Sequence, residues 1–173
     1  MASVKKDHDE FRAISGRIRA TSPLLDRYID LGEVPTWYDY ALSDIALLVS
    51  ADEIRHVDSE FTADDTQSNA QSARIVIFTD TLIIDVIGSF DGKIHERTVT
   101  ARKRVVTSLG VQAGDKATGN DEGARIWPGR LKIRFQLATG EVYSLPLTTE
   151  STFETRASLL ALLSALREDL ARG

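Results

Sequence analysis

A change of hydrophobic period near the carboxyl end constrains the fold of this chain more than any other feature. Residues 131–137, Leu-Lys-Ile-Arg-Phe-Gln-Leu, alternate apolar and polar side chains, which predicts a strand with one buried face. After Pro146 this pattern gives way to a strongly apolar helix over residues 152–171. Several strand-like segments come earlier, so the order of periods predicts a small curled β-sheet sealed by a C-terminal helix.

The terminal helix has its own start signal and a single apolar stripe. Residues 151–154, Ser-Thr-Phe-Glu, fit a capping box, in which the serine and the glutamate each satisfy a backbone donor. The stripe consists of leucines, each of which contributes roughly 1.5–3 kcal/mol when buried: Leu159, Leu162, Leu163, Leu166 and Leu170, with Leu160 beside them. We expect a packing helix, because it lacks the Lys- and Arg-rich polar face of an interfacial helix.

Three helices are predicted in the first fifty residues. Residues 6–20 carry one helical stripe, formed by Phe11, Ile14 and Ile18. A second helix is expected between Ser22, which can cap its start before Pro23, and Gly32, which ends it cheaply in the left-handed conformation. Residues 37–42 form the third, shorter helix.

From residue 53 onward the pattern changes to strands separated by turns. Turn residues stand at 79–81, at Asp91-Gly92 and at Thr139-Gly140, while residues 63–72 and 113–129 are expected to be loops. The expected strands are 53–62, 74–78, 82–87, 97–101, 104–112, 130–138 and 141–147. The sequence therefore predicts an α+β fold, with an N-terminal helical extension over 1–48 and a domain of seven strands and one helix over 49–173.

Composition excludes several classes of function. The net charge of −5 argues against general affinity for nucleic acid or anionic membranes, since both require surplus Lys and Arg. The chain has no cysteine, which excludes disulfides, thiolate zinc sites and a cysteine nucleophile. The charged start shows no signal peptide, and no apolar run approaches the ~18 residues that span a bilayer. We therefore expect a soluble, cytoplasmic protein.

No residue pattern indicates a catalytic or metal site. His8, His56 and His95 form no HExxH motif and no pair at ligand spacing, and we interpret His56 and His95 as surface strand residues. The glycine-bearing residues 114–119 lack the Gly-Lys-Ser/Thr ending of a phosphate-binding loop. Paired carboxylates such as Asp64-Asp65 lie in polar loops, where nothing would shift a pKa toward catalysis. We expect no enzyme activity and no cofactor.

Two segments carry a resemblance to a known family. Residues 50–57, Ser-Ala-Asp-Glu-Ile-Arg-His-Val, look like an opening acidic, aliphatic strand, and residues 75–83 look like a strand, a Thr-Asp turn and a Leu-Ile strand. Over residues 50–171 the chain resembles the pleckstrin-homology-like (PH-like) superfold, especially its bacterial and GRAM-type members. The resemblance implies a seven-stranded antiparallel split barrel capped by a C-terminal helix, and a binding platform without catalysis.

The lipid-binding role of that family does not carry over. Phosphoinositide binders of the family place Lys and Arg on the first strand and its following loop. Here the only basic residue of residues 52–65 is Arg55, and it is opposed by Asp52, Glu53, Asp58, Glu60, Asp64 and Asp65. Like charge would repel a phosphate headgroup.

Basic residues cluster instead at residues 93–104, which hold Lys93, Arg97, Arg102, Lys103 and Arg104 against Glu96. They form either a solvated sheet face or a docking patch for an acidic partner. Lys132 and Arg134 lie on the outward side of their strand if Leu131, Ile133 and Phe135 face inward. Trp127, beside Pro128, is either a core residue or an aromatic interface anchor. The candidate partner-binding residues are thus Arg102, Lys103, Arg104 and Trp127.

Three functions follow from these patterns. The first is a non-catalytic interaction module that binds a protein or peptide, with the peptide adding to the strand edge 104–112 beside the terminal helix. The second is a peripheral binder of anionic lipid that uses residues 93–104. The third is a structural homo-oligomer paired through the helices of residues 6–32.

Overall fold

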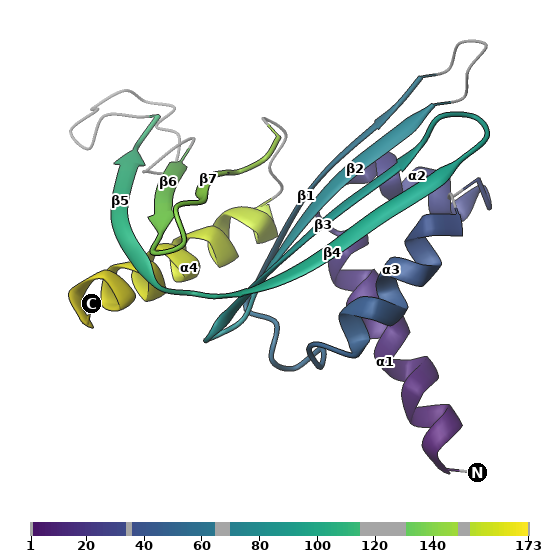
Figure 1. The fold of residues 1–173 in the computed structure, drawn as a ribbon, viewed down its shortest axis with the longest axis horizontal. Helices are drawn as coiled ribbons and strands as arrows, with labels where there is room; N and C mark the ends of the chain where they lie inside the picture. Colours follow the sequence, from purple (N-terminus) through teal and green to yellow (C-terminus); the bar gives the residue numbers. More distant parts are fainter. Residues whose placement is uncertain (1, 34–35, 65–69, 115–130, 149–152, 173) are drawn as a thin grey trace, which may run out of the picture. The chain divides into compact units, whose positions relative to one another are not determined.

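A computed structural model of the chain describes residues 2–33, 36–64, 70–114, 131–148 and 153–172 (Figure 1). The chain divides into two compact units, Met1–Lys103 and Arg104–Gly173. Each unit is built around an antiparallel sheet of its own, with four strands in the first and three in the second. Of the described helices, none is long and apolar enough to cross a membrane.

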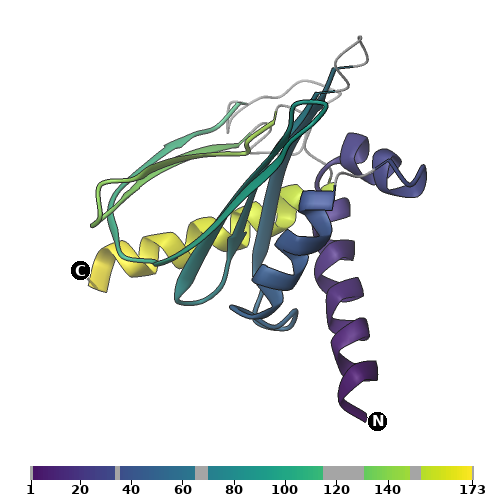
Figure 2. The same ribbon diagram turned by 45° about the vertical axis from the view of Figure 1, so that its right-hand side comes forward.

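The first unit consists of three helices followed by four strands. The sheet runs in the order β1-β2-β3-β4, and every neighbouring pair is antiparallel. Figures 1 and 2 both show α1 and α3 on one side of this sheet. The elements are α1 (Ala2–Arg19), α2 (Pro23–Asp30), α3 (Thr36–Ala46), β1 (His56–Ala63), β2 (Gln71–Phe78), β3 (Leu82–Phe90) and β4 (His95–Lys103).

The three predicted helices are confirmed. The Ser22 side chain accepts a hydrogen bond from the Leu25 N–H and caps α2, whose first residue is Pro23. Gly32 has φ +71° just after the helix, the left-handed conformation that favours glycine. The helix α3 extends to Ala46, four residues further than predicted from residues 37–42, because Ile45 continues its buried face.

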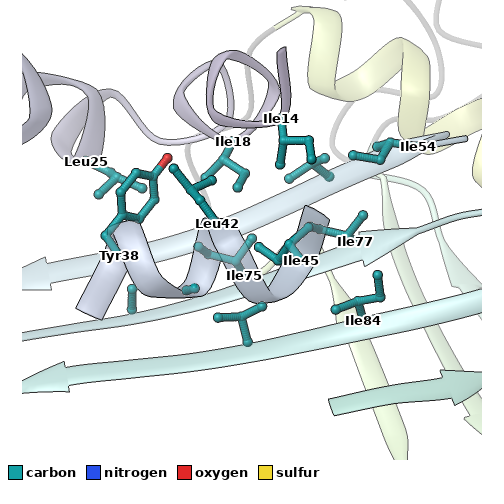
Figure 3. Close-up of a cluster of buried hydrophobic side chains, with 14 of the residues drawn as sticks. Ile14, Ile18, Leu25, Tyr38, Leu42, Ile45, Ile54, Ile75, Ile77 and Ile84 are labelled. Carbon is teal, nitrogen blue, oxygen red and sulfur yellow. The ribbon is translucent and has the colours of Figure 1, made fainter. Parts of the chain in front are cut away.

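The helices cover one face of the sheet and form the core of the first unit (Figure 3). The predicted N-terminal extension, residues 1–48, therefore packs on the sheet β1–β4 within one compact unit. The predicted division of the chain into this extension and a seven-stranded domain stays a prediction. The largest fully buried side chains of this core are Trp37, Ile14, Ile18, Leu25, Ile45, Ile75, Ile77 and Ile84. Helix and sheet approach each other closely at Gly88, where a Cβ atom would lie 2.3 Å from Cε3 of Trp37.

The predicted turns between the strands are also present. Thr79 Oγ1 accepts a hydrogen bond from the Leu82 N–H, which fixes the tight turn between β2 and β3. The Asp91 carboxylate accepts hydrogen bonds from the backbone N–H groups of Lys93 and Ile94, and Gly92 has φ +93°. These local hydrogen bonds set the register of the two hairpins, in which Phe78 lies opposite Ile83 and Phe90 opposite His95.

The second unit contains β5 (Val106–Gln112), β6 (Lys132–Leu137), β7 (Val142–Leu145) and α4 (Phe153–Arg172), with the sheet order β5-β6-β7. The alternation of residues 131–137 predicted β6 correctly, since Lys132, Arg134 and Gln136 are exposed and the residues between them are buried. Gly140, with φ +97°, turns the chain into β7.

The helix α4 packs against this sheet with most of its predicted stripe. Leu159, Leu162 and Leu166 are buried, whereas Leu160 and Leu170 are exposed. Its contacts include β5, as Figures 1 and 2 show. The predicted capping box at 151–154 lies outside the described residues, apart from the start of the helix backbone at Phe153.

The seven described strands form two sheets, one of four strands and one of three. The α+β class and the C-terminal helix are confirmed, but within the described residues β4 and β5 belong to separate sheets. Only Arg104 and Val105 join them, and neither residue favours a tight turn. The Val105 carbonyl accepts a hydrogen bond from the Ala138 N–H, and Arg104 binds Asp169. Both contacts lie within the second unit and fix the chain at the start of its sheet.

Two glycines test the helix-on-sheet packing in opposite directions. Gly88→Ala should lower the free energy of unfolding by about 1–3 kcal/mol, since its Cβ would overpack against the Trp37 ring. Gly16→Ala, in α1, should raise it by about 0.5–1 kcal/mol, because no heavy atom lies within 4 Å of the added Cβ and alanine favours helix. Urea unfolding of both variants measures the difference, and effects of the same sign would contradict this packing.

Candidate functional site

The edge strands of the two sheets are candidate binding sites. Among the described residues, each of β1, β4, β5 and β7 is paired with one strand alone. An edge strand presents backbone N–H and C=O groups that a further strand can bind, and proteins protect such edges with charge, burial or shortness.

Three of the four edges carry such protection. The strand β4 holds Arg97, Arg102, Lys103 and Glu96, and charged side chains discourage pairing with another strand. Five of the eight residues of β1 are buried. The strand β7 has only four residues and is followed directly by Pro146. Each of these strands is a poor template for an added strand.

The strand β5 is different. Its sequence, Val-Thr-Ser-Leu-Gly-Val-Gln, contains no charged residue, and five of its seven residues are exposed. Val111, which lies opposite the buried Ile133, is itself 51% exposed. Among the described edges, β5 alone combines length, exposure and the absence of charge.

The end of α4 is tied to the start of β5 by a buried ion pair. Nε of Arg104 donates to Oδ2 of Asp169 at 2.6 Å, and the two side chains are only 4% and 13% exposed. Arg172 lies further out, 2.9 Å from Glu168 and 4.0 Å from Asp169, on the exposed side of the helix. This pair ties the end of α4 to the residues just before β5, the strand that α4 contacts.

The candidate partner-binding residues differ in their surroundings. Arg102, half-buried, and Lys103, exposed, are consecutive in β4 and therefore lie on opposite faces of the first sheet. Arg104 belongs to the second unit and is buried against α4. Trp127 lies outside the described residues. A partner-binding role for these residues stays a prediction.

Arg97, another member of the basic cluster, is also engaged within the first unit. Its Nε lies 2.7 Å from Oδ2 of Asp44, and its guanidinium lies 5.0 Å from the centre of the Tyr40 ring. The hydrogen bond to Asp44 raises the pKa of the Arg97 guanidinium. The sequence could not reveal this pairing, because Asp44 and Arg97 are distant along the chain.

A groove of about 660 Å³ between the helices of the first unit was missed by the sequence analysis. Phe11, Arg12 and Ser15 of α1 line it together with Leu42 of α3. The Ser15 hydroxyl in this groove forms a hydrogen bond with the hydroxyl of Tyr38, at 3.0 Å. Burial raises the pKa of Tyr38 to about 12. Residues of separate helices line the groove, so no local sequence pattern predicts it.

His56 corrects one of our expectations. We interpreted it as a surface residue, but it is only 2% exposed, with its ring 5.7 Å from that of Phe78. Burial lowers its pKa to about 4, so it is neutral at pH 7. His95 is exposed, as expected. Among the described residues, no group of three or more His, Cys, Asp or Glu side chains could hold a metal ion.

Comparisons of the chain with protein-family models, with curated proteins and with solved structures found no match. The function must therefore be argued from the strands, helices and charges described above.

The buried histidine predicts a dependence of stability on pH. Unfolded histidine binds a proton near pH 6.5, whereas folded His56 binds one only near pH 4. The free energy of unfolding should therefore fall as the pH is lowered from 6.5 to 4, by up to about 3 kcal/mol from this residue. His56→Gln should remove that part of the slope, and His95→Gln, at an exposed site, should keep it. Denaturant titrations across this range would contradict the assignment if all three proteins gave equal slopes.

The ion pair at the end of α4 predicts a contrast between two substitutions. Asp169→Asn should lower the free energy of unfolding by about 3–5 kcal/mol, because it removes the carboxylate that the buried Arg104 guanidinium binds. Arg172→Ala, at the neighbouring exposed pair, should change it by less than about 1 kcal/mol. Thermal unfolding followed by circular dichroism measures both, and a near-neutral Asp169→Asn would show that the pair does not hold the helix.

Proposed function

We propose that this chain is a non-catalytic interaction module of PH-like split-barrel architecture, which binds an extended peptide of a partner protein along β5. Seven antiparallel strands in two sheets, followed by one helix, support the PH-like part of the proposal. The exposed, uncharged edge of β5 is the observation that carries the binding part.

Strand addition suits the chemistry of this edge. A peptide that pairs with β5 gains backbone hydrogen bonds along the strand, while alternate side chains of the peptide face the two sides of the sheet. On the inner side they would meet Val111 and Leu109, which lie opposite Ile133 and Phe135. The ion pair between Arg104 and Asp169 keeps α4 beside this edge, so the peptide meets a surface already in place.

The two other functions have less support. Adsorption to anionic lipid through residues 93–104 would use Arg97 and Arg104, which are already paired with carboxylates. Pairing of copies through residues 6–32 would use Ile14, Ile18 and Leu25, which are buried in the core of the first unit.

Peptide selection followed by NMR tests the proposal. A phage-displayed library of random decapeptides is panned against the full chain, and a selected peptide is titrated into ¹⁵N-labelled protein. Alternate β5 amides, those that do not bond to β6, should gain protection from hydrogen exchange, because only these can bond to an added strand.

The opposite edge of the same sheet provides the control. Amides of β7 should not change, since this strand is short and followed by Pro146. Failure to select any peptide would reject the proposal, as would protection confined to β7 or to the helices α1–α3.

A further inference from the structure

The outward face of the three-stranded sheet has a one-sided charge. Its β6 residues are Lys132, Arg134 and Gln136, all exposed. Their neighbours on β5 and β7 are uncharged: Ser108, Gly110, Gln112, Val142 and Ser144. The strands β5, β6 and β7 are fully described, and the outward residues in this register include two cations and no acid. In a chain of net charge −5, this face is therefore locally basic.

Gly110 lies directly between Arg134 and the open edge. In the register of the sheet, Gly110 of β5 is opposite Arg134 of β6. Any other residue at this position would place a side chain beside the arginine, on the same face. Glycine leaves the path from Arg134 to the edge open.

Neither backbone nor packing requires a glycine at position 110. The positive-φ glycines among the described residues are Gly32, Gly92 and Gly140, so Gly110 has an ordinary strand conformation. A Cβ at this position would have a single neighbour, the Arg134 carbonyl oxygen at 3.7 Å, which is an ordinary contact. Glycine inside a strand weakens it, and often marks a place where a ligand or another backbone approaches.

The spacing of strands places a peptide residue within reach of Arg134. A peptide paired with β5 lies two strand spacings, about 10 Å, from β6. The Arg134 side chain can extend from β6 and an acidic side chain from the peptide, and the two can meet above Gly110 of β5, where no side chain stands between them. A guanidinium binds a carboxylate through two parallel N–H···O bonds, so it is well suited to this role.

We propose that Arg134, reaching across Gly110, selects partner peptides that carry Asp or Glu at the outward position opposite Gly110. Lys132 lies on the same face two residues away and adds to the positive potential. This inference rests on the proposed binding of a peptide along β5 and names the chemistry of its partner. The contact is exposed to water, so it contributes more to selectivity than to affinity.

Panning of the same decapeptide library on variants of the full chain tests this proposal. Peptides selected by the unaltered chain should be enriched in Asp or Glu at one position, and Arg134→Glu should shift that position to Lys or Arg. A synthetic copy of a selected acidic peptide should bind Arg134→Glu at least about fivefold more weakly than the unaltered chain. Gly110→Val should still bind peptide, because valine favours strand, but should lose the acidic preference.

The matched control is Arg27→Glu, which changes the net charge equally at an exposed residue of the first unit. It should leave the acidic preference unchanged. If selected peptides protect the β5 amides from hydrogen exchange but show no preference for Asp or Glu, this inference is wrong and the proposed function stands. The same conclusion follows if they show the same preference with Arg134→Glu. If no peptide is selected, or if bound peptide leaves β5 unaltered, the proposed function fails and this inference fails with it.

Discussion

The buried pair of Arg104 and Asp169 is the interaction on which the candidate site depends. Removing both charges from water is costly, and a buried ion pair often adds little net stability. The pair also fixes geometry, because it joins Arg104, which stands between β4 and β5, to Asp169 near the end of α4. The apolar contacts of Leu162 and Leu166 are less directional, and they alone would allow the helix to slide along the sheet.

The edge strands β4 and β5 differ in charge. The edge of β4 carries charged residues toward both of its ends, and Asp44 and Tyr40 of α3 hold one of them, Arg97. The edge of β5 carries none. Natural sheets seldom leave a long edge unprotected without a use for it. The contrast within one chain is the main reason for assigning partner binding to the second sheet.

Local signals predicted most of the fold, and distant contacts were beyond their reach. Ser22 and Pro23, the Thr79 turn and the alternation of β6 each depend on a few neighbouring residues, and each was predicted correctly. The Arg104 ion pair joins residues 65 apart in sequence, so the basic cluster was interpreted as one surface patch. His56 was misplaced because β1 is buried on both faces at its start, which removes the alternation that would mark an inward residue. The division of the seven strands between two sheets was likewise not predicted, since hairpin signals do not say which strands pair across a sheet.

The open β5 edge has a consequence for the chain in isolation. Backbone groups that can receive a partner peptide can equally receive the same strand of another copy, since strand pairing requires little sequence complementarity. If the proposed function holds, partner and self-association compete for this edge, and the competition shifts toward self-association as the protein concentration rises. A bound partner would thus act as a chaperone for this strand, and excess unpartnered chain would be the form at risk of aggregation.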